Sequence, residues 1–431
     1  MRHFGILVLS LFAVSPGEWI LSAHAQESGV HRELSLDEAL RLGADNIPQL
    51  VRARAEQKVV ESRKEGAKLW LSQNPYASIL MGRRKETTSD PTATGLQYQV
   101  HIEQALEIAG QRWARLAAVA SQIEVAKAQT ELAQVESRAL LLTAYVQASL
   151  ADQRVAVARG REELAERLLG SAQARLDLGA TGELDVNLAQ VEKGRVRGDR
   201  VQAEVLLASR QVVLGILCGI SPLPKLVLTS SHAAPPEISA EHEQLAALYS
   251  LAESERADLL AVRRQQDALS NEINRLRREA IPNLVLSFDY QRDLPGQDFV
   301  GGTVGLSFPF WNRNQGPIAQ MQATELQRQA EERLLLTRIR GEVMVAHLKL
   351  QLLRVQVKEF QKDVLPPAER NIELLRRGWQ AGKFDLFRVI TASRELTETR
   401  LRFLDLLEDL WIAAIELERS VGAPLLVGVP S

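Results

Sequence analysis

The sequence contains little cysteine and few aromatic residues. Cys218 is the only cysteine among 431 residues, so an intramolecular disulfide is impossible. Its place beside Leu217, at an expected helix end, predicts a small buried apolar side chain. Aromatic residues make up only 5 % of the chain, which is low for one large compact core. Long coiled helices need few aromatics, because Leu, Val and Ala fill their seams. The formal net charge of −2 gives no electrostatic reason to expect nucleic acid as a partner.

Long hydrophobic runs are also missing after the N-terminal segment. No later stretch approaches the ~20 apolar residues that a membrane helix needs, so a chain that spans a membrane would have to use strands. The N-terminus itself has Arg2, an apolar run over 4–14 and the small-x-small site Ala23-His24-Ala25. This pattern predicts a signal peptide over 1–25 and export of the mature chain. The alternative is a disordered or helical N-terminus of a cytosolic protein. No cysteine follows the site, so acylation there is not expected.

Proline is absent from 92–221, 237–281 and 318–365, and these gaps permit very long helices. A heptad seam predicts that such helices form and pair as coiled coils. In the second half the seam consists of Leu336, Ile339, Val343, Ala346, Leu350, Leu353, Val357, Phe360 and Val364. We expect helices at about 36–72, 111–178, 184–218, 241–280, 315–378 and 383–421. A helix over 315–378 would be about 95 Å long, so the molecule must be elongated.

The chain reads as two copies of one pattern: helix, strand pair, long helix, glycine turn, helix. Three landmarks recur 200 to 207 positions later, namely Pro75 at Pro282, Gly182 at Gly382 and Gly219 at Gly422. This near-constant spacing suggests an internal duplication. The predicted division is a signal peptide 1–25, a first repeat 26–219, a linker 220–240, a second repeat 241–422 and a tail 423–431. The first repeat holds a strand pair at about 75–106, a long helix 111–178 and a helix 184–218. The second holds a strand pair at about 283–310, a long helix 315–378 and a helix 383–421.

The strand segments alternate between apolar and polar residues with period two, so each strand has one apolar face and one polar face. The predicted lipid-facing residues are Leu96, Tyr98, Val100, Ile102, Leu284, Leu286, Phe288, Tyr290, Val304 and Leu306. The predicted pore-facing residues are Gln97, Gln99, His101, Glu103, Ser287, Asp289, Thr303 and Ser307. Alternatively, the strands cover a helical core and turn their polar faces to water. The length of about ten residues, and aromatics such as Trp70, Trp113 and Trp311 near the strand ends, favour a membrane barrel. Four strands cannot close a barrel, so several copies are needed, and three would supply twelve strands.

Three sequence motifs resemble those of the TolC-type outer-membrane factors, and they are most similar to the cobalt–zinc–cadmium efflux branch. They are Val304-Gly305-Leu306-Ser307-Phe308-Pro309-Phe310-Trp311-Asn312-Arg313-Asn314-Gln315-Gly316, Glu103-Gln104-Ala105-Leu106-Glu107-Ile108-Ala109-Gly110-Gln111-Arg112, and Leu34-Ser35-Leu36-Asp37-Glu38-Ala39-Leu40. The resemblance implies a mainly α fold with a small β part. Three chains would together form a 12-stranded outer-membrane barrel that continues into a periplasmic helical tunnel. It further implies that the trimer lies in the outer membrane of a Gram-negative bacterium, in contact with outer-membrane lipid. The implied protein partners are a periplasmic adaptor (membrane fusion protein) and an inner-membrane RND pump. The chain would be a passive exit duct, with heavy-metal cations as the expected substrate.

The expected periplasmic end is the pair of helical hairpin tips. Residues assigned to adaptor docking and to the mouth of the duct are Gly179, Gly182, Asp185, Gly378, Gly382, Asp385 and Arg388. Glycines after helix ends also serve any helical hairpin, and the two aspartates could simply favour a helix N-terminus. Many relatives carry acidic residues where this chain has Arg388 and Thr391, which puts an acidic cation-binding ring in doubt.

The sequence predicts no catalytic, cofactor or metal site. Its histidines after the signal segment do not pair at i and i+4, and there is no His–Cys cluster of the kind that zinc needs. No glycine-rich phosphate loop and no nucleophile elbow is found, so the chain is not expected to be an enzyme. Two rival interpretations stay open. One is a periplasmic coiled-coil adaptor, although its usual non-repeated strand domains are not found. The other is a soluble helical scaffold protein.

Overall fold

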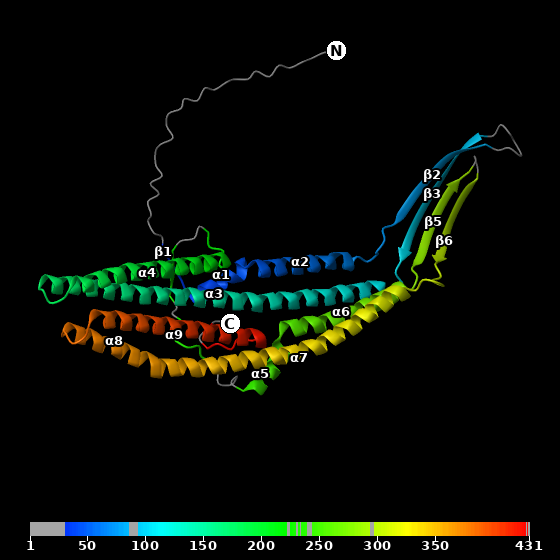
Figure 1. The fold of residues 1–431 in the computed structure, drawn as a ribbon. Coiled ribbons are helices and arrows are strands. Elements are labelled where there is room, and N and C mark those ends of the chain that lie inside the picture. The colour runs from blue at the N-terminus through cyan, green and yellow to red at the C-terminus, as the bar shows by residue number, and fades with distance from the viewer. Residues whose placement is uncertain are drawn as a thin grey trace, which may run out of the picture.

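The computed structural model describes residues 31–85, 94–221, 225–229, 232, 234–238, 244–293, 297–427 and 429. The expected signal peptide lies outside these residues. The structure is a long layer of helices with a four-stranded sheet at one end (Figure 1). The helices are α1 (Leu36–Asn46), α2 (Pro48–Lys68), α3 (Gln111–Asp177), α4 (Glu183–Leu217), α5 (Leu245–Glu255), α6 (Ala257–Glu279), α7 (Gln315–Glu359), α8 (Leu365–Gln380) and α9 (Leu386–Val421). A π-helical turn, η2 (Phe360–Val364), joins α7 to α8.

The helical layer is four helices wide along its whole length. In the half next to the sheet, the helix order is α2, α3, α6, α7, and in the other half it is α4, α3, α9, then α7 and α8 (Figure 1). The 67 residues of α3 span about 100 Å and cross both halves. In both halves, one edge of the layer belongs to the first repeat and the other edge to the second.

Three helices that the sequence predicted as continuous are interrupted. The helix expected at 36–72 breaks at Ile47, whose backbone is extended because the next residue is Pro48. The helix expected at 241–280 breaks at Arg256 without any proline. The buried Arg256 guanidinium instead donates hydrogen bonds to Asp258 and Glu342, and to the Ser420 carbonyl at 2.9 Å.

The helix expected at 315–378 contains a third interruption, the π-helical turn η2. Pro366 and Pro367 follow this turn, in the first residues of α8. A proline has no N–H and its ring crowds the carbonyl four residues earlier. The wider π turn places the Leu365 N–H on the Phe360 carbonyl and lets the helix axis continue past the two prolines.

The four-stranded sheet has the order β2–β3–β5–β6, and all of its neighbours are antiparallel. Its strands are β2 (Tyr76–Lys85), β3 (Thr94–Leu106), β5 (Leu284–Arg292) and β6 (Asp298–Leu306). The central β3–β5 pair joins the two repeats, and β2 and β6 are the open edges. The strand pair expected to reach residue 310 ends at Leu306, so Ser307 lies outside β6 and its assignment as a strand residue was wrong.

The main core lies in the middle of the helical layer, beside the short parallel pair of β1 (His31–Leu34) and β4 (Lys225–Leu228). The predicted heptad seam supplies Ile339, Val343, Ala346 and Leu350, which are all buried. Cys218 is also buried, and burial raises the pKa of its thiol to about 11, so the thiol stays neutral. Among the described residues, no helix is both long enough and apolar enough to cross a membrane.

Candidate functional site

The strand register sorts the side chains of the sheet into one polar and one apolar face. His101 lies opposite Asp289 and Glu103 lies opposite Ser287, which in turn faces Thr303. On the other face, Ile102 pairs with Phe288, Val100 with Tyr290 and Leu286 with Val304. The apolar face is not covered by the rest of the chain, and Val304 is 71 % exposed. The sheet therefore keeps the two faces that the sequence pattern implies, while the assignment of these faces to pore and lipid stays a prediction.

The polar face carries a hydrogen-bonded cluster around His101. Its Nδ1 lies 2.8 Å from Asp289 Oδ1 and its Nε2 lies 3.4 Å from Glu103 Oε2. Gln99 and Ser287 donate to the two carboxylate oxygens of Asp289 at 3.5 and 3.4 Å. Each ring nitrogen of His101 is thus occupied by a carboxylate of its own sheet. Within the part of the chain that the structure describes, no group of three or more His, Cys, Asp or Glu side chains could hold a metal ion.

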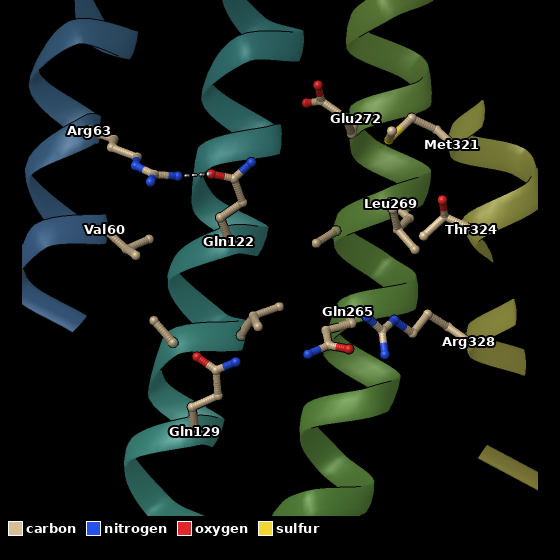
Figure 2. Close-up of a pocket in the computed structure, with 13 residues that line it drawn as sticks. Val60, Arg63, Gln122, Gln129, Gln265, Leu269, Glu272, Met321, Thr324 and Arg328 are labelled. Atoms are coloured by element: carbon tan, nitrogen blue, oxygen red, sulfur yellow. Dashed lines mark hydrogen bonds between the residues drawn. The ribbon is translucent and has the colours of Figure 1, made fainter. Parts of the chain in front are cut away.

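A cavity of about 470 Å³ lies in the half of the helical layer that adjoins the sheet, on one face of the layer. Figure 2 shows its walls, to which α2, α3, α6 and α7 all contribute side chains. We call the face of the layer that carries this hollow the concave face. The lining combines apolar side chains, such as Val60 and Leu269, with amides and guanidinium groups, and Arg63 donates to Gln122 at 3.2 Å.

The hairpin tips lie at the opposite end of the layer from the sheet (Figure 1). Gly179 and Gly382 both adopt the left-handed conformation that ends a helix, with φ of +68° and +73°. Gly182 instead has φ −93° and is the residue before α4, and its counterpart before α9 is Asp385. The sequence-based pairing of Gly182 with Gly382 was therefore wrong. Gly378 lies inside α8, where a Cβ would come within 2.2 Å of the Phe384 ring.

The charged residues of the tips have local partners. Asp385 accepts a hydrogen bond from the Arg388 backbone N–H at 2.8 Å, which caps α9. The Arg388 guanidinium lies 3.8 Å from Asp385 and stacks on the Phe384 ring. Asp185 accepts from the Thr181 hydroxyl in the first-repeat tip. Asp385 therefore supports the start of a helix, whereas Asp185 only lies in the first turn of α4. A role of either aspartate in docking stays a prediction. Apolar side chains beside them, Leu178, Leu184 and Phe387, are exposed.

A buried ionic cluster that the sequence did not reveal joins the two repeats near the tips. Glu192 on α4 accepts from Arg161 on α3 at 2.8 Å and from Arg394 on α9 at 2.5 Å. Burial by itself raises the Glu192 pKa, but the hydrogen bonds from Arg394 and Arg161 outweigh it and hold the pKa below its ordinary value. This cluster could not be predicted from the sequence alone, because nothing in the residue pattern distinguishes Glu192 from the other charged residues of the long helices.

Known proteins share this sequence and this fold. Residues 248–423 match the family described as outer membrane efflux protein. The chain is 27 % identical over 395 residues to the cobalt-zinc-cadmium resistance protein CzcC of Cupriavidus metallidurans, and the match covers 90 % of each chain. Its fold is similar to that of CusC, with a TM-score of 0.73, 16 % identity, and 90 % and 92 % of the two chains covered. The outer membrane protein VceC of Vibrio cholerae is similar at a TM-score of 0.68 and 16 % identity, with 90 % and 96 % covered.

In sequence and in fold, the chain is thus similar to the TolC-type outer-membrane efflux proteins. The fold class expected from the sequence, mainly helical with a small sheet part, is confirmed. The chain is an efflux channel of the Gram-negative outer membrane, and the family model and the fold that it matches are those of transport channels. Proteins of the family work with adaptor and pump partners in tripartite systems.

Proposed function

We propose that three copies of the chain assemble head to tail into a closed duct that carries heavy-metal cations across the outer membrane. The proposal rests on the open edges of the sheet and of the helical layer. In both, one edge belongs to the first repeat and the opposite edge to the second repeat, and the two edges can pack against each other. The first-repeat edge of one copy would meet the second-repeat edge of the next. Such heterologous contacts form a ring when the rotation closes.

The open edges of the sheet support this arrangement. Neighbouring strands alternate in direction along β2–β3–β5–β6, so β2 of one copy and β6 of the next are antiparallel when placed side by side. An open sheet edge leaves unpaired N–H and C=O groups, which lipid does not tolerate. Two copies would give eight strands, whose interior side chains fill the lumen. Three copies, as the resemblance to the TolC-type factors implies, give twelve strands and leave room for a channel.

The edges of the helical layer support the same contacts. On α7, beside the buried seam, a second apolar stripe is exposed, and it repeats at steps of three and four residues. It consists of Val345, Leu348, Leu352 and Val355. On α4, the outward stripe consists of small and β-branched residues, Val191, Gly194, Gly198, Val201, Val205 and Val212. Large side chains on one edge and small ones on the other fit knobs-into-holes packing between copies.

The substrate class and the partners are inferred from the relatives. CzcC is a cobalt-zinc-cadmium resistance protein and covers 90 % of this chain, which supports divalent heavy-metal cations as the cargo. We infer a periplasmic adaptor and an RND-type pump as partners. The exposed apolar tips, with Gly179, Gly182, Asp185, Gly378, Gly382, Asp385 and Arg388, would be the surface that meets the adaptor. The chain itself supplies no energy, so transport through it is passive.

Measurement of the particle mass tests the assembly directly. The mature protein, purified in detergent, is expected to show three times the chain mass in native mass spectrometry. Leu348→Glu combined with Leu352→Glu should shift it to monomer, because each of the three interfaces would then have to bury two carboxylates. Gln351→Glu combined with Lys358→Glu, about 80° and 100° around the same helix from the centre of the stripe, is the matched control and should remain trimeric. A wild-type monomer that stays in solution without detergent would contradict the proposal.

A further inference from the structure

The junction between sheet and helices carries a concentration of exposed aromatic rings and arginines. We define the junction belt as the aromatic residues Trp70, Trp113, Phe308, Phe310 and Trp311 with the arginines Arg112, Arg277, Arg278 and Arg313. All five rings are largely exposed, and Trp311 is 88 % exposed. Trp70 lies just after α2, Trp113 lies in the first turn of α3, and the other three rings lie just before α7.

The four belt arginines make no salt bridge within the described part of the chain, whereas just over half of the arginines described there make at least one. Arg112 donates to the Lys68 carbonyl, Arg278 to the Ala109 carbonyl and Arg313 to the Pro309 carbonyl. Arg112 also lies 5.2 Å from the centre of the Trp113 ring. In contrast, arginines along the helices, such as Arg154, Arg161 and Arg275, each contact one or two carboxylates. At the junction, no carboxylate of the described chain holds these four guanidinium groups in a salt bridge. Burial by itself raises the Glu107 pKa, but the hydrogen bond from Arg115 and, in part, the charge of Arg112 lower it overall, and Glu107 forms its salt bridge with Arg115.

Hydrogen bonds between distant segments fix the belt in place. Gln111 at the start of α3 donates to the Ile281 carbonyl at 3.2 Å. Asn314 before α7 donates to the Leu276 carbonyl at 2.9 Å. The ends of α3, α6 and α7 are therefore tied to one another, and their arginines and rings form one zone rather than separate loops.

Helix geometry places much of this zone on the side away from the concave face. Trp113 precedes the cavity residue Gln122 by nine positions, which at about 100° per residue is half a turn around α3. Arg277 and Arg278 follow the cavity residue Glu272 by five and six positions, about 140° and 240° around α6. If the concave face lines the duct, these side chains point outward, at the level where the exposed apolar face of the sheet begins.

We propose that the junction belt binds the phosphate groups of anionic phospholipids in the membrane leaflet nearest the helical layer. This inference rests on the proposed membrane position of the sheet. Exposed Trp and Phe rings suit the boundary between hydrocarbon and headgroups. Guanidinium groups bind phosphate oxygens in a bidentate manner, and an arginine near a membrane surface attracts anionic lipid. The belt would fix the depth of the channel in the membrane and collect phosphatidylglycerol-like lipids around it.

Lipid binding to the purified full-length mature protein tests the proposal. Native mass spectrometry with added dioleoyl phosphatidylglycerol or phosphatidylcholine should show about tenfold or greater preference for phosphatidylglycerol. The variant with Arg112, Arg277, Arg278 and Arg313 all changed to Gln should lose this preference. The matched control changes Arg52, Arg195, Arg370 and Arg402 to Gln, which are exposed and without salt bridges, and it should keep the preference. Changing the four belt arginines to Lys should retain most of the preference for phosphatidylglycerol. This variant keeps the positive charges, so it shows whether the Gln variant fails for lack of charge or for lack of folding. Equal binding of both lipids to the wild type, or an unchanged preference in the Gln variant, would overturn the inference.

A second measurement separates this proposal from the proposed membrane position. Of the tryptophans after residue 25, Trp70, Trp113 and Trp311 are in the belt, Trp379 is buried, and Trp411 packs against His232. Reconstituted into vesicles of brominated phosphatidylcholine, the protein should lose tryptophan fluorescence, and Phe at the three belt positions should remove the effect. Absence of quenching would count against the membrane position itself. Quenching without a phosphatidylglycerol preference would reject only the lipid specificity. Competition by inorganic phosphate alone, without lipid preference, would identify a free-anion site and would also reject it.

Discussion

The Glu192 carboxylate on α4 and the Arg394 guanidinium on α9 lie 2.5 Å apart and connect the two repeats close to the hairpin tips. The Glu192 side chain is only 6 % exposed, and Arg161 on α3 occupies its other oxygen at 2.8 Å. One buried carboxylate therefore holds three helices together. A buried ion is destabilising as soon as it loses a partner, so this cluster is sensitive to any change in the packing of the tips.

Removal of Arg394 should weaken the helical layer. In Arg394→Met, the Glu192 carboxylate keeps its salt bridge to Arg161 but loses the one to Arg394. Less of the cost of burying its charge is then offset. Since Arg394 is itself partly exposed, we expect a cost of about 1–2 kcal/mol rather than the full value for a buried pair. Arg400→Met, which breaks the exposed Arg400–Glu369 pair on the same helix, is the control and should cost about 0–0.5 kcal/mol. Thermal unfolding followed by far-UV circular dichroism compares the two. Equal midpoints for the two variants would show that Glu192 does not depend on Arg394.

The same cluster predicts a dependence of stability on pH. The Glu192 pKa lies below its ordinary value of 4.5 in the folded chain, so the folded state favours the ionised form. Its contribution is fully present above pH 4.5, and it is lost as the pH falls through the lower folded-state pKa. Wild type should thus be more stable than Glu192→Gln at neutral pH, and the difference should shrink below pH 4.5. Unfolding midpoints of both proteins over this range measure it. A difference that grows toward acid would contradict the assigned direction.

Gly422, after α9, should tolerate a side chain less well than Gly110. Both glycines have a left-handed backbone, with φ of +81° and +76°. A Cβ at Gly422 would also lie 3.2 Å from backbone atoms of Glu255 and Arg256 at the break between α5 and α6, whereas a Cβ at Gly110 meets open space. Gly110→Ala should cost about 1 kcal/mol for the conformation alone. Gly422→Ala should cost about 2–4 kcal/mol, because backbone cannot move aside easily. Thermal unfolding of the two variants checks the order, and a Gly422→Ala cost no larger than the Gly110→Ala cost would contradict it.

Periodic features of the structure could be predicted from the sequence, and isolated polar contacts could not. The heptad seam on α7 and the alternation in β3, β5 and β6 follow from residue spacing, since each repeats over many residues. The break at Ile47 could have been anticipated from Pro48. The break at Arg256 could not, because it depends on Ser420 and Glu342, which are remote in sequence.

The duplication shows the same limit at the level of single residues. Aligning the tips by their second glycines gives a spacing of 200, whereas the left-handed residues Gly179 and Gly382, and also Gly219 and Gly422, are 203 positions apart. The backbone conformation of a glycine, and not its presence, identifies the equivalent position. This regular spacing supports the duplication that we infer from the sequence. By this spacing Asp385 is the counterpart of Gly182 and not of Asp185, and each of the two is the N-cap residue just before its helix.

Arg388 provides a test of the proposed mouth of the duct. Its guanidinium is largely exposed at the second-repeat tip, and three copies would place three positive charges around a narrow opening. Fixed charges at a constriction change local ion concentrations, so Arg388→Glu should shift the channel toward cation selectivity and change its conductance. Arg370→Glu, an equal charge change on α8 farther from the tip, is the control and should have little effect. Planar-bilayer recordings in a salt gradient give the reversal potential of each channel. If Arg388→Glu leaves both reversal potential and conductance as in wild type, the tips do not form the constriction, and the mouth must lie elsewhere along the duct.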